Sequence, residues 1–393
     1  MRLSVGEYLA GEFDECRTVN RPPEYPDYPK PGEPRWGRWG LALGSVVGMQ
    51  SVLLLMLWPK EQPRLEMLLW SALLPLGWGV MLAVRVLVWQ ILLFNRQVYL
   101  RTSLVATNVW WQRRRLGLPV QSVVLLGPAG DVQANYLHLM KDAAPPKVFE
   151  VAGAIRPRLR CQVSLSVISE RAPALGRHLG RLALASAELS ECWPHLRAVV
   201  WVGSKASQTA FEDVLTKGGI VLPSARLPLQ NLAELDHLID VFHRDCSGEN
   251  DWLLCAGVSS IATAQDGELP GEAGFYWRVS RQARQLLHRG EYLADGASVE
   301  LCAQMQRYAG LEQPPSDCLA LDKASQDAFV EGGWSAAEHQ LAGQWGVLGD
   351  LAPFIGMSLA LLQAGAAGQP CGWLSQDANK RLAIGVAVPY GNS

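Results

Sequence analysis

Two long apolar runs near the N-terminus constrain this chain more than any other feature. The first, WGLALGSVVGMQSVLLLMLW, occupies 39–58 and carries no charged residue. About 20 helical residues cross the hydrocarbon core of a bilayer, and tryptophans favour its two interfaces. A short break, PKEQPR, leads to a second apolar run at 65–94. The pattern predicts a transmembrane helical hairpin, in preference to a signal peptide or a buried core helix.

Basic residues predict how this hairpin is oriented. Three precede the first span and six follow the second, whereas the loop between them holds two. Arg85 falls at an interface if the second span covers about 67–84, and it can snorkel there. By the positive-inside rule both ends are cytoplasmic, so we expect a multi-pass protein of the bacterial inner membrane with a large cytoplasmic domain.

The stretch WWQRRR ends in three consecutive arginines, Arg113, Arg114 and Arg115. A basic cluster this close to a span is typical of contact with anionic lipid head groups. A solvated surface cluster is the alternative, and the sequence does not separate the two interpretations. We class the three residues as membrane-proximal basic residues.

A proline-rich segment precedes the hairpin. Residues 18–35, TVNRPPEYPDYPKPGEPR, hold six prolines and few apolar side chains. Such a composition predicts an extended, polyproline-like tail. We interpret it as a spacer, with a docking peptide as the alternative.

Composition excludes several classes of function. The formal net charge of -2 and a pI near 6.4 argue against nucleic-acid binding. Eight cysteines form no CxxC pair and seven histidines show no ligand spacing, so no metal site is expected. Free thiols in a reducing cytosol fit the chain better than disulfides. The turn GPAGDV at 127–132 lacks the spacing of a nucleotide-binding loop, and we expect no cofactor.

From about residue 118 short apolar runs alternate with amphipathic stretches of helical period. This alternation predicts an α/β domain with buried, mostly parallel strands. The expected strands are 122–127, 160–168, 197–203, 219–223, 252–257, 274–279, 318–322, 371–375 and 382–388. The expected helices are 171–188, 206–216, 228–245, 280–289, 297–308, 323–343 and 350–365.

The order of these elements carries a resemblance. A helix leads to DWLLCAGVSS, a short spacer leads to ELPGEAGFYWRV, and GVLGDLAPFIGMSLALLQAG follows near the end. This succession resembles the thiolase-like superfamily, specifically β-ketoacyl synthases, over about 120–390. There a helix precedes a strand ending in Gly-Gly, a Pro-Gly-Glu-Gly-Ala turn opens the next strand, and a Gly-His-Thr turn starts a late helix.

The resemblance implies a five-layer α-β-α-β-α domain made of two similar halves, preceded here by the transmembrane hairpin. Gly257, Gly271, Gly274 and Gly349 are then the fold-motif glycines, which permit tight turns or close backbone approach. We expect a tail at 1–38, two transmembrane helices at 39–95 and a basic juxtamembrane linker at 96–117. The N-terminal half of the domain is expected at 118–260 and the C-terminal half at 261–393.

The resemblance also implies where catalytic groups would be. The family's cysteine nucleophile falls near Gln230 or Asn231, and no cysteine lies between Cys192 and Cys246. Its two histidines fall at Lys323 and at Asp350. All three positions are degenerate, and an aspartate replaces a neutral histidine as proton donor only if burial strongly raises its pKa.

These observations predict a protein without catalytic residues that acts by binding. The resemblance extends to adaptor proteins of type VI secretion, which implies a protein partner such as a secreted effector or a spike component. A homodimer is compatible with the fold. The alternative is a divergent acyl-thioester enzyme at the membrane face that uses Cys255, Cys246 or Asp350. A structural scaffold without cargo is a third interpretation.

Overall fold

The computed structural model describes residues 21–57, 59, 64–141, 148–149, 158–163, 167–246, 248–264, 268–294 and 296–390. It divides into two units, Pro22–Trp111 and Gln112–Ser393. The first twenty residues of the expected tail, part of the PKEQPR loop and part of the expected strand at 160–168 lie outside the described residues.

Two apolar helices make up most of the first unit. Helix α1 spans Trp36–Leu57, and α2 runs without a break from Arg64 to Arg115, with Pro75 inside it. The helices touch: the rings of Trp39 and Trp78 lie 5.7 Å apart. Both helices are long and apolar enough to cross a membrane, as the sequence predicts. The region at 96–115, expected as a linker, continues α2.

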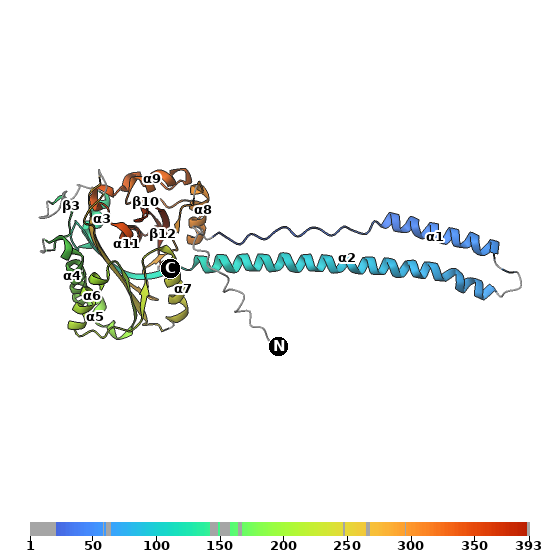
Figure 1. Ribbon diagram of the computed structural model, residues 1–393, viewed down its shortest axis with the longest axis horizontal. Coiled ribbons are helices and arrows are strands. Elements are labelled where there is room, and N and C mark those ends of the chain that lie inside the picture. Colours follow the sequence, from blue (N-terminus) through green and yellow to red (C-terminus); the bar gives the residue numbers. More distant parts are fainter. Residues whose placement is uncertain are drawn as a thin grey trace. The chain divides into compact units, whose positions relative to one another are not determined.

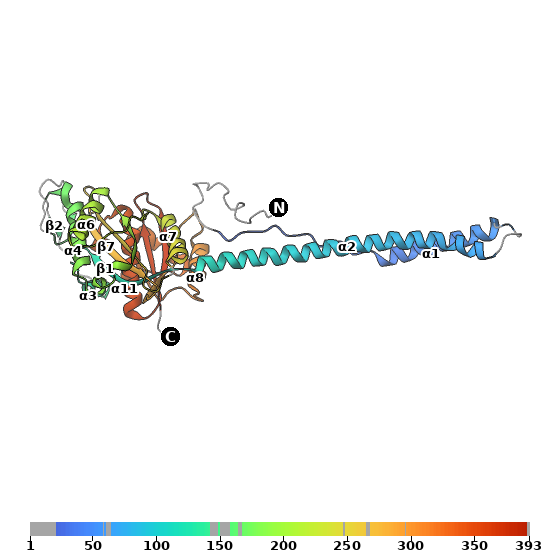
Figure 2. The same ribbon diagram turned by 90° about the horizontal axis from the view of Figure 1, so that it is seen from below.

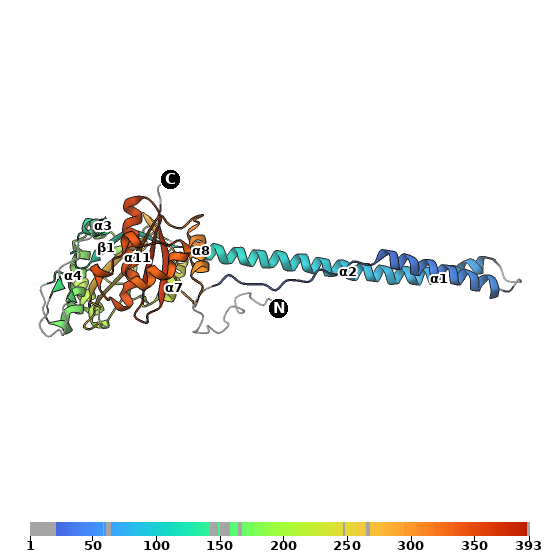
Figure 3. The same ribbon diagram turned by 90° about the horizontal axis from the view of Figure 1, so that it is seen from above.

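The proline-rich segment has no regular secondary structure between residues 21 and 35. It runs beside α2, as Figures 2 and 3 show. The hydroxyl group of Tyr99 on α2 donates a hydrogen bond of 2.9 Å to the carbonyl of Pro26. The ring of Tyr28 lies 5.3 Å from that of Tyr99. This segment therefore covers one side of α2 in the part of the helix that α1 does not reach.

The second unit is an α/β domain (Figure 1). Its longer strands are β1 (Leu118–Leu126), β4 (Leu196–Val202), β6 (Trp252–Ser260), β7 (Glu272–Ser280), β11 (Cys371–Gln376) and β12 (Leu382–Pro389). The shorter strands are β2 (Val148–Phe149), β3 (Arg158–Leu159), β5 (Arg226–Pro228), β8 (Gln285–Leu287), β9 (Glu291–Tyr292) and β10 (Asp317–Ala320). The helices are α3 (Gln133–Lys141), α4 (Arg171–Ala185), α5 (Ala187–Ser190), α6 (Lys205–Lys217), α7 (Leu232–Asp245), α8 (Ser298–Ala309), α9 (Lys323–Phe329), α10 (Ala342–Trp345) and α11 (Ala352–Ala367).

The main sheet is mixed. Its strand order is β10-β11-β12-β8-β1-β7-β6-β4-β5, with β9 attached to β12. Only β10–β11, β4–β5 and β4–β6 pair in parallel among the described strands. The expectation of mostly parallel strands is therefore wrong. Full burial on both faces, as in β7, gives continuous apolar runs that do not reveal strand direction.

The sheet encloses its central helices. Helix α11 contacts β1, β7 and β8 as well as β10, β11 and β12, and its side chains share one core with those of α7. Helices α4 and α6 cover the opposite face of β4, β6 and β7, while α8 and α9 pack on β12 and β11. The layers thus alternate helix and sheet. The two expected sheets are joined through β8 into one hydrogen-bonded sheet.

Four expected elements differ in the structure. The segment 323–343, expected as one helix, holds α9, two 3-10 turns and the start of α10, because Gly332 and Gly333 interrupt it. The segment 280–289, expected as a helix, contains strand β8. The segment 219–223 is not a strand, and β5 begins at Arg226 instead. In place of a strand at 160–168, the described part shows β3 ending at Leu159 and a 3-10 turn beginning at Ile168.

Candidate functional site

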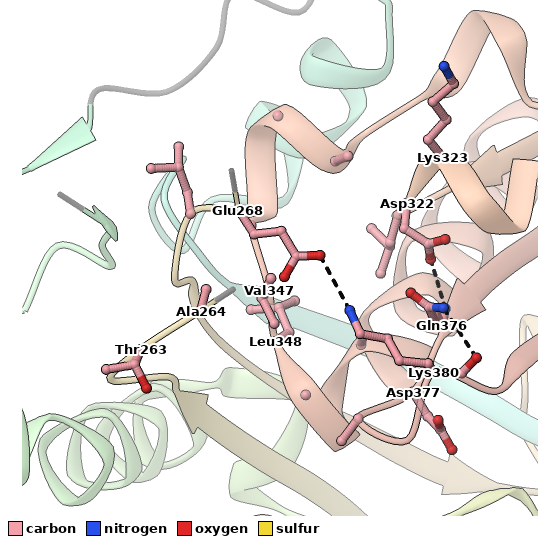
Figure 4. Close-up of a pocket in the computed structure, with 18 residues that line it drawn as sticks. Thr263, Ala264, Glu268, Asp322, Lys323, Val347, Leu348, Gln376, Asp377 and Lys380 are labelled. Carbon is pink, nitrogen blue, oxygen red and sulfur yellow. Dashed lines mark hydrogen bonds and ion pairs between the residues drawn. The ribbon is translucent and has the colours of Figure 1, made fainter. Parts of the chain in front are cut away.

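A pocket of about 720 Å³ opens beside the carboxyl end of β10, where three loops meet (Figure 4). One loop follows β6, one precedes α11, and one joins β11 to β12. Its lining residues are Thr263, Ala264, Glu268, Leu269, Leu321, Asp322, Lys323, Ala342, Gly343, Gly346, Val347, Leu348, Gly349, Ala352, Gln376, Asp377, Ala378 and Lys380. Lys323 and Gly349, far apart in the sequence, thus share one cavity.

Most charged groups of the pocket have partners within the chain. Asp322 caps α9 by accepting a hydrogen bond of 2.7 Å from the backbone of Ser325, and it accepts another of 2.8 Å from the backbone of Gln376. Lys380 lies 3.3 Å from the carboxylate of Glu268 (Figure 4). Lys323 is exposed at the first position of α9.

Asp377 organises the turn between β11 and β12. Its carboxylate accepts hydrogen bonds of 2.9 Å from the backbone N–H groups of Asn379 and Arg381 and from the Arg381 side chain. The Arg381 guanidinium lies 4.0 Å from the ring centre of Tyr292. Burial, and then the nearby carboxylate of Asp377, raises the pKa of Tyr292 to about 12, so this hydroxyl stays protonated and donates.

Tyr292 connects this turn to the start of α7. The carboxylate of Asp377 raises the pKa of the Tyr292 hydroxyl, and the backbone of Leu232, the first residue of α7, lowers it. Asn231 caps α7 through a hydrogen bond of 3.0 Å from the backbone of Glu234. Glu234 in turn accepts from the backbone of Gln230. Gln230 and Asn231 are thus engaged in a reciprocal cap and do not line the pocket.

Asp350 follows a left-handed Gly349, whose φ of 62° favours glycine. Asp350 is exposed and does not line the pocket, although Gly349 before it does. Partial burial, and then the carboxylate of Asp377, raises the pKa of Asp350 above its usual value. A raised pKa increases the fraction of Asp350 that carries a proton at a given pH, and proton donation requires the protonated form.

The cysteines proposed as alternative nucleophiles are inside the domain. Cys255 lies in the middle of β6 with 0% exposure, and Cys246 ends α7 with 3%. Burial raises the pKa of both thiols. A buried neutral thiol is a poor nucleophile. Among the described cysteines, only Cys192 is partly exposed.

The fold-motif glycines lie at close backbone contacts. A Cβ on Gly271 would lie 2.1 Å from the carbonyl oxygen of Trp345, and one on Gly257 would lie 2.7 Å from that of Val202. At Gly274 it would lie 2.9 Å from a methyl group of Val258. Side chains at these positions would displace the neighbouring backbone or strand.

The expectation that all three arginines lie at the membrane or in solvent is wrong for Arg114. It is buried at 9% exposure, pairs with Asp236 and Glu291, and donates a hydrogen bond of 3.1 Å to Tyr308. Arg113 and Arg115 are exposed. Successive helical residues point about 100° apart, so a run of three arginines at a helix end places one against the protein and two in solvent.

Sequence reasoning missed the polar turn at 377–381 and its contact with Tyr292. A signal was present, because the turn DANKR lies between two apolar strands and carries three charged residues. In the described part of the chain, no group of three or more histidine, cysteine, aspartate or glutamate residues is placed to hold a metal ion.

Comparison with known proteins supports the fold. A ketosynthase from module 1 of the bacillaene synthase of Bacillus amyloliquefaciens superposes with a TM-score of 0.50 at 10% identity, covering 72% of this chain and 77% of that one. The ishigamide ketosynthase/chain length factor reaches 0.48 at 13% identity, covering 70% and 100%. OleA from Xanthomonas campestris reaches 0.43 at 12%, covering 69% and 98%. No family model and no curated protein matches the sequence. The first of these likenesses confirms a thiolase-like α/β fold and nothing finer.

Proposed function

We propose that this chain is a membrane-anchored, thiolase-like protein that performs no thioester chemistry and acts as a protein-binding adaptor. The observation that carries the proposal is the start of α7. The resemblance to ketoacyl synthases implies that this position would hold the nucleophile. Here the side chain of Asn231 accepts a hydrogen bond from the backbone of Glu234 and caps the helix. An asparagine that caps a helix has no thiol group to attack a thioester, and its side-chain oxygen is directed at the helix backbone.

The remaining charged groups support the same proposal. Asp322, Asp377 and Lys380 are held by hydrogen bonds and an ion pair within the chain. Such groups maintain the geometry of the loops around the pocket. A fold that keeps its packing while its reactive positions change is suited to recognition.

The cargo we propose is a secreted effector or a spike component of type VI secretion, which follows from the resemblance to adaptors of that system. Two apolar helices would hold the adaptor at the inner membrane, with the domain in the cytoplasm. There the domain would load cargo before export. A homodimeric adaptor is compatible with this role.

One experiment separates the adaptor from an acyl-thioester enzyme. The detergent-solubilised full chain is incubated with a chloroacryl-pantetheine probe, and labelled cysteines are located by mass spectrometry. We expect the buried Cys246 and Cys255 to stay unlabelled in the folded chain and to be labelled only after denaturation. The variant Asn231→Cys is the positive control, because a thiol at the start of α7 should be labelled if the probe reaches that site. Labelling of Cys246 or Cys255 in the folded protein contradicts the proposal.

A second experiment addresses the adaptor role itself. The tagged full chain is used to capture the type VI effector encoded beside its gene, with an unrelated hairpin membrane protein as the control. We expect retention of the effector only by this chain. Retention of neither an effector nor a spike component would leave a scaffold as the better interpretation.

The enzyme alternative has one observation in its favour. Lys323 and Gly349 line a cavity of about 720 Å³, and the pKa of the adjoining Asp350 is raised. A cation beside a carboxyl group with a raised pKa would be able to polarise a carbonyl group. Hydrolysis of an acyl-pantetheine thioester tests this candidate, with Asp350→Asn as the variant that would abolish turnover.

A further inference from the structure

The part of α2 beyond the membrane hairpin exposes a continuous apolar face. Trp39, three residues after α1 begins, contacts Trp78, so α1 accompanies α2 only to about residue 81 in an antiparallel hairpin. The 22 residues of α1 measure about 33 Å, which suffices to span a bilayer. With α1 taken as one span, more than 40 Å of α2 lies outside the hydrocarbon region, at roughly 1.5 Å per residue.

Within the described residues, this outer part of α2 is covered on one side only. Half-buried residues recur at 82, 89, 96, 103 and 110, one every seven positions. Tyr99, which binds the proline-rich segment through Pro26 and Tyr28, is also half-buried. These half-buried positions follow one face of the helix, and Figures 2 and 3 show the proline-rich segment running beside α2.

The uncovered side carries a heptad repeat. Val84, Ile91, Val98 and Val105 recur every seven residues, and each is 46–55% exposed. Leu87 and Phe94 follow three residues after the first two. β-branched residues at one position of a heptad with large apolar residues three positions later are typical of a two-stranded parallel coiled coil. The positions seven and fourteen residues after Phe94 are Arg101 and Asn108, which are polar. The apolar seam is therefore strongest from Val84 to Val98.

We propose that this face pairs with the same face of a second copy of the chain to form a parallel coiled-coil stalk. Two copies in one membrane run in the same direction, so each residue of the seam meets its own counterpart. The seam and its neighbours are Val84, Leu87, Val88, Ile91, Phe94, Val98, Val105 and Val109, exposed by 41–65%. About half of each side chain is exposed, so together they would bury a part of the roughly 800 Å² that a partner contributes to a standard interface.

The lipid surface does not fit this face. Helix α2 is continuous from Arg64 to Arg115 (Figure 1), and a helix that crosses the bilayer cannot also lie flat on its surface without a break. Pro75, its one proline, lies within the hairpin. An apolar heptad in water lowers its free energy by meeting another apolar heptad, and a second copy supplies one of matching register.

Disulfide cross-linking in native membranes tests the stalk. Val98→Cys and Val105→Cys place thiols on the seam, and Leu104→Cys places one on a position that is 65% exposed and points about 100° away from Val105. After oxidation with copper phenanthroline we expect dimer bands from the seam variants at least fivefold above those of wild type and Leu104→Cys. Equal cross-linking at all three positions, or none at the seam, overturns the proposal.

A second measurement separates this stalk from a dimer formed by the domain. The full chain is reconstituted in nanodiscs of phosphatidylethanolamine and phosphatidylglycerol, and its mass distribution is measured. Val98→Glu should reduce the dimer fraction at least fivefold, and Arg101→Leu should increase it, because it removes a repelled pair of charges from the seam. A dimer fraction that neither variant changes, or a purely monomeric wild type, overturns the proposal. Circular dichroism checks that both variants keep their helix content.

Discussion

Arg171 and Glu272 form a two-point ion pair inside the domain, with neither side chain exposed to solvent. Nε of Arg171 lies 2.9 Å from one carboxylate oxygen of Glu272, and Nη2 lies 2.6 Å from the other. Arg158, also buried, lies 3.7 Å from the same carboxylate. Glu272 belongs to the PGEAG turn that opens β7, so a turn singled out for its glycines also supplies the counter-charge for two buried arginines.

Glu272→Gln should strongly destabilise the domain. It would leave Arg171 and Arg158 buried without a carboxylate, and breaking a buried ion pair costs about 3–5 kcal/mol. For a domain of this size we expect the apparent melting temperature of the full chain to fall by at least about 6 °C, measured by intrinsic tryptophan fluorescence.

The matched control is Glu268→Gln. Glu268 pairs with Lys380 at 3.3 Å, and both side chains are more than a third exposed. Exposed pairs contribute about 0–1 kcal/mol, so the melting temperature should stay within about 2 °C of wild type. Equal effects of the two variants would contradict the role given to the buried pair.

Arg114→Leu should destabilise the domain, whereas Arg113→Leu should not. Arg114 contacts α7 through Asp236, β9 through Glu291 and α8 through Tyr308. Its loss would remove one cation from the buried Glu291 and one from Asp236, which keeps Arg289 at 3.2 Å, at an expected cost of a few kcal/mol. Urea unfolding of the full chain followed by fluorescence measures this difference. A variant at 113 as unstable as that at 114 would show that helix charge, and not the buried contact, matters.

The sequence predicted strands best where they are long and apolar on both faces. The strands expected at 252–257, 274–279 and 382–388 correspond to β6, β7 and β12, each slightly longer in the structure. Helix α11 was equally clear, because its central residues are buried almost all round. Uniform burial gives an unbroken apolar signal, which a single sequence displays directly.

The shorter strands depend on tertiary pairing. RQARQLLHR at 281–289 has helical composition, yet Gln285–Leu287 pairs with both β1 and β12. Two backbone ladders outweigh a weak helical preference in so short a segment. At the site, Lys323 and Asp350 were placed by resemblance, but Tyr292, Asp377 and Arg381 act through contacts between strands that no local pattern encodes.

Thiol reagents should distinguish Cys192 from the other described cysteines. Cys192 is partly exposed, and its sulfur lies 2.9 Å from a guanidinium nitrogen of Arg278. Cys302 and Cys318 are buried, and burial raises the pKa of each thiol to about 12. Brief treatment of the folded chain with N-ethylmaleimide should label Cys192 at least tenfold faster than the buried thiols, as measured by peptide mass spectrometry.

One variant controls this labelling. Cys192→Ser should remove the fast-reacting site while leaving the slow ones unchanged. Rapid labelling of Cys255 in the folded protein would contradict its position inside β6.

Acid should weaken the domain partly through His288. Its side chain is 5% exposed, and burial, opposed by a hydrogen bond with the backbone of Arg115, lowers its pKa from 6.5 to about 4. Because the unfolded chain then binds a proton more readily than the folded one, this contribution to stability is complete above pH 6.5. It is lost as the pH falls from 6.5 toward 4, by about 1.4 kcal/mol per pH unit.

His288→Gln should lower stability at pH 7.5 but flatten its decline between pH 7 and 5, measured by urea unfolding at each pH. The matched control, exposed His195→Gln, should retain the wild-type slope, and an unchanged slope in His288→Gln would show that other groups cause the acid sensitivity.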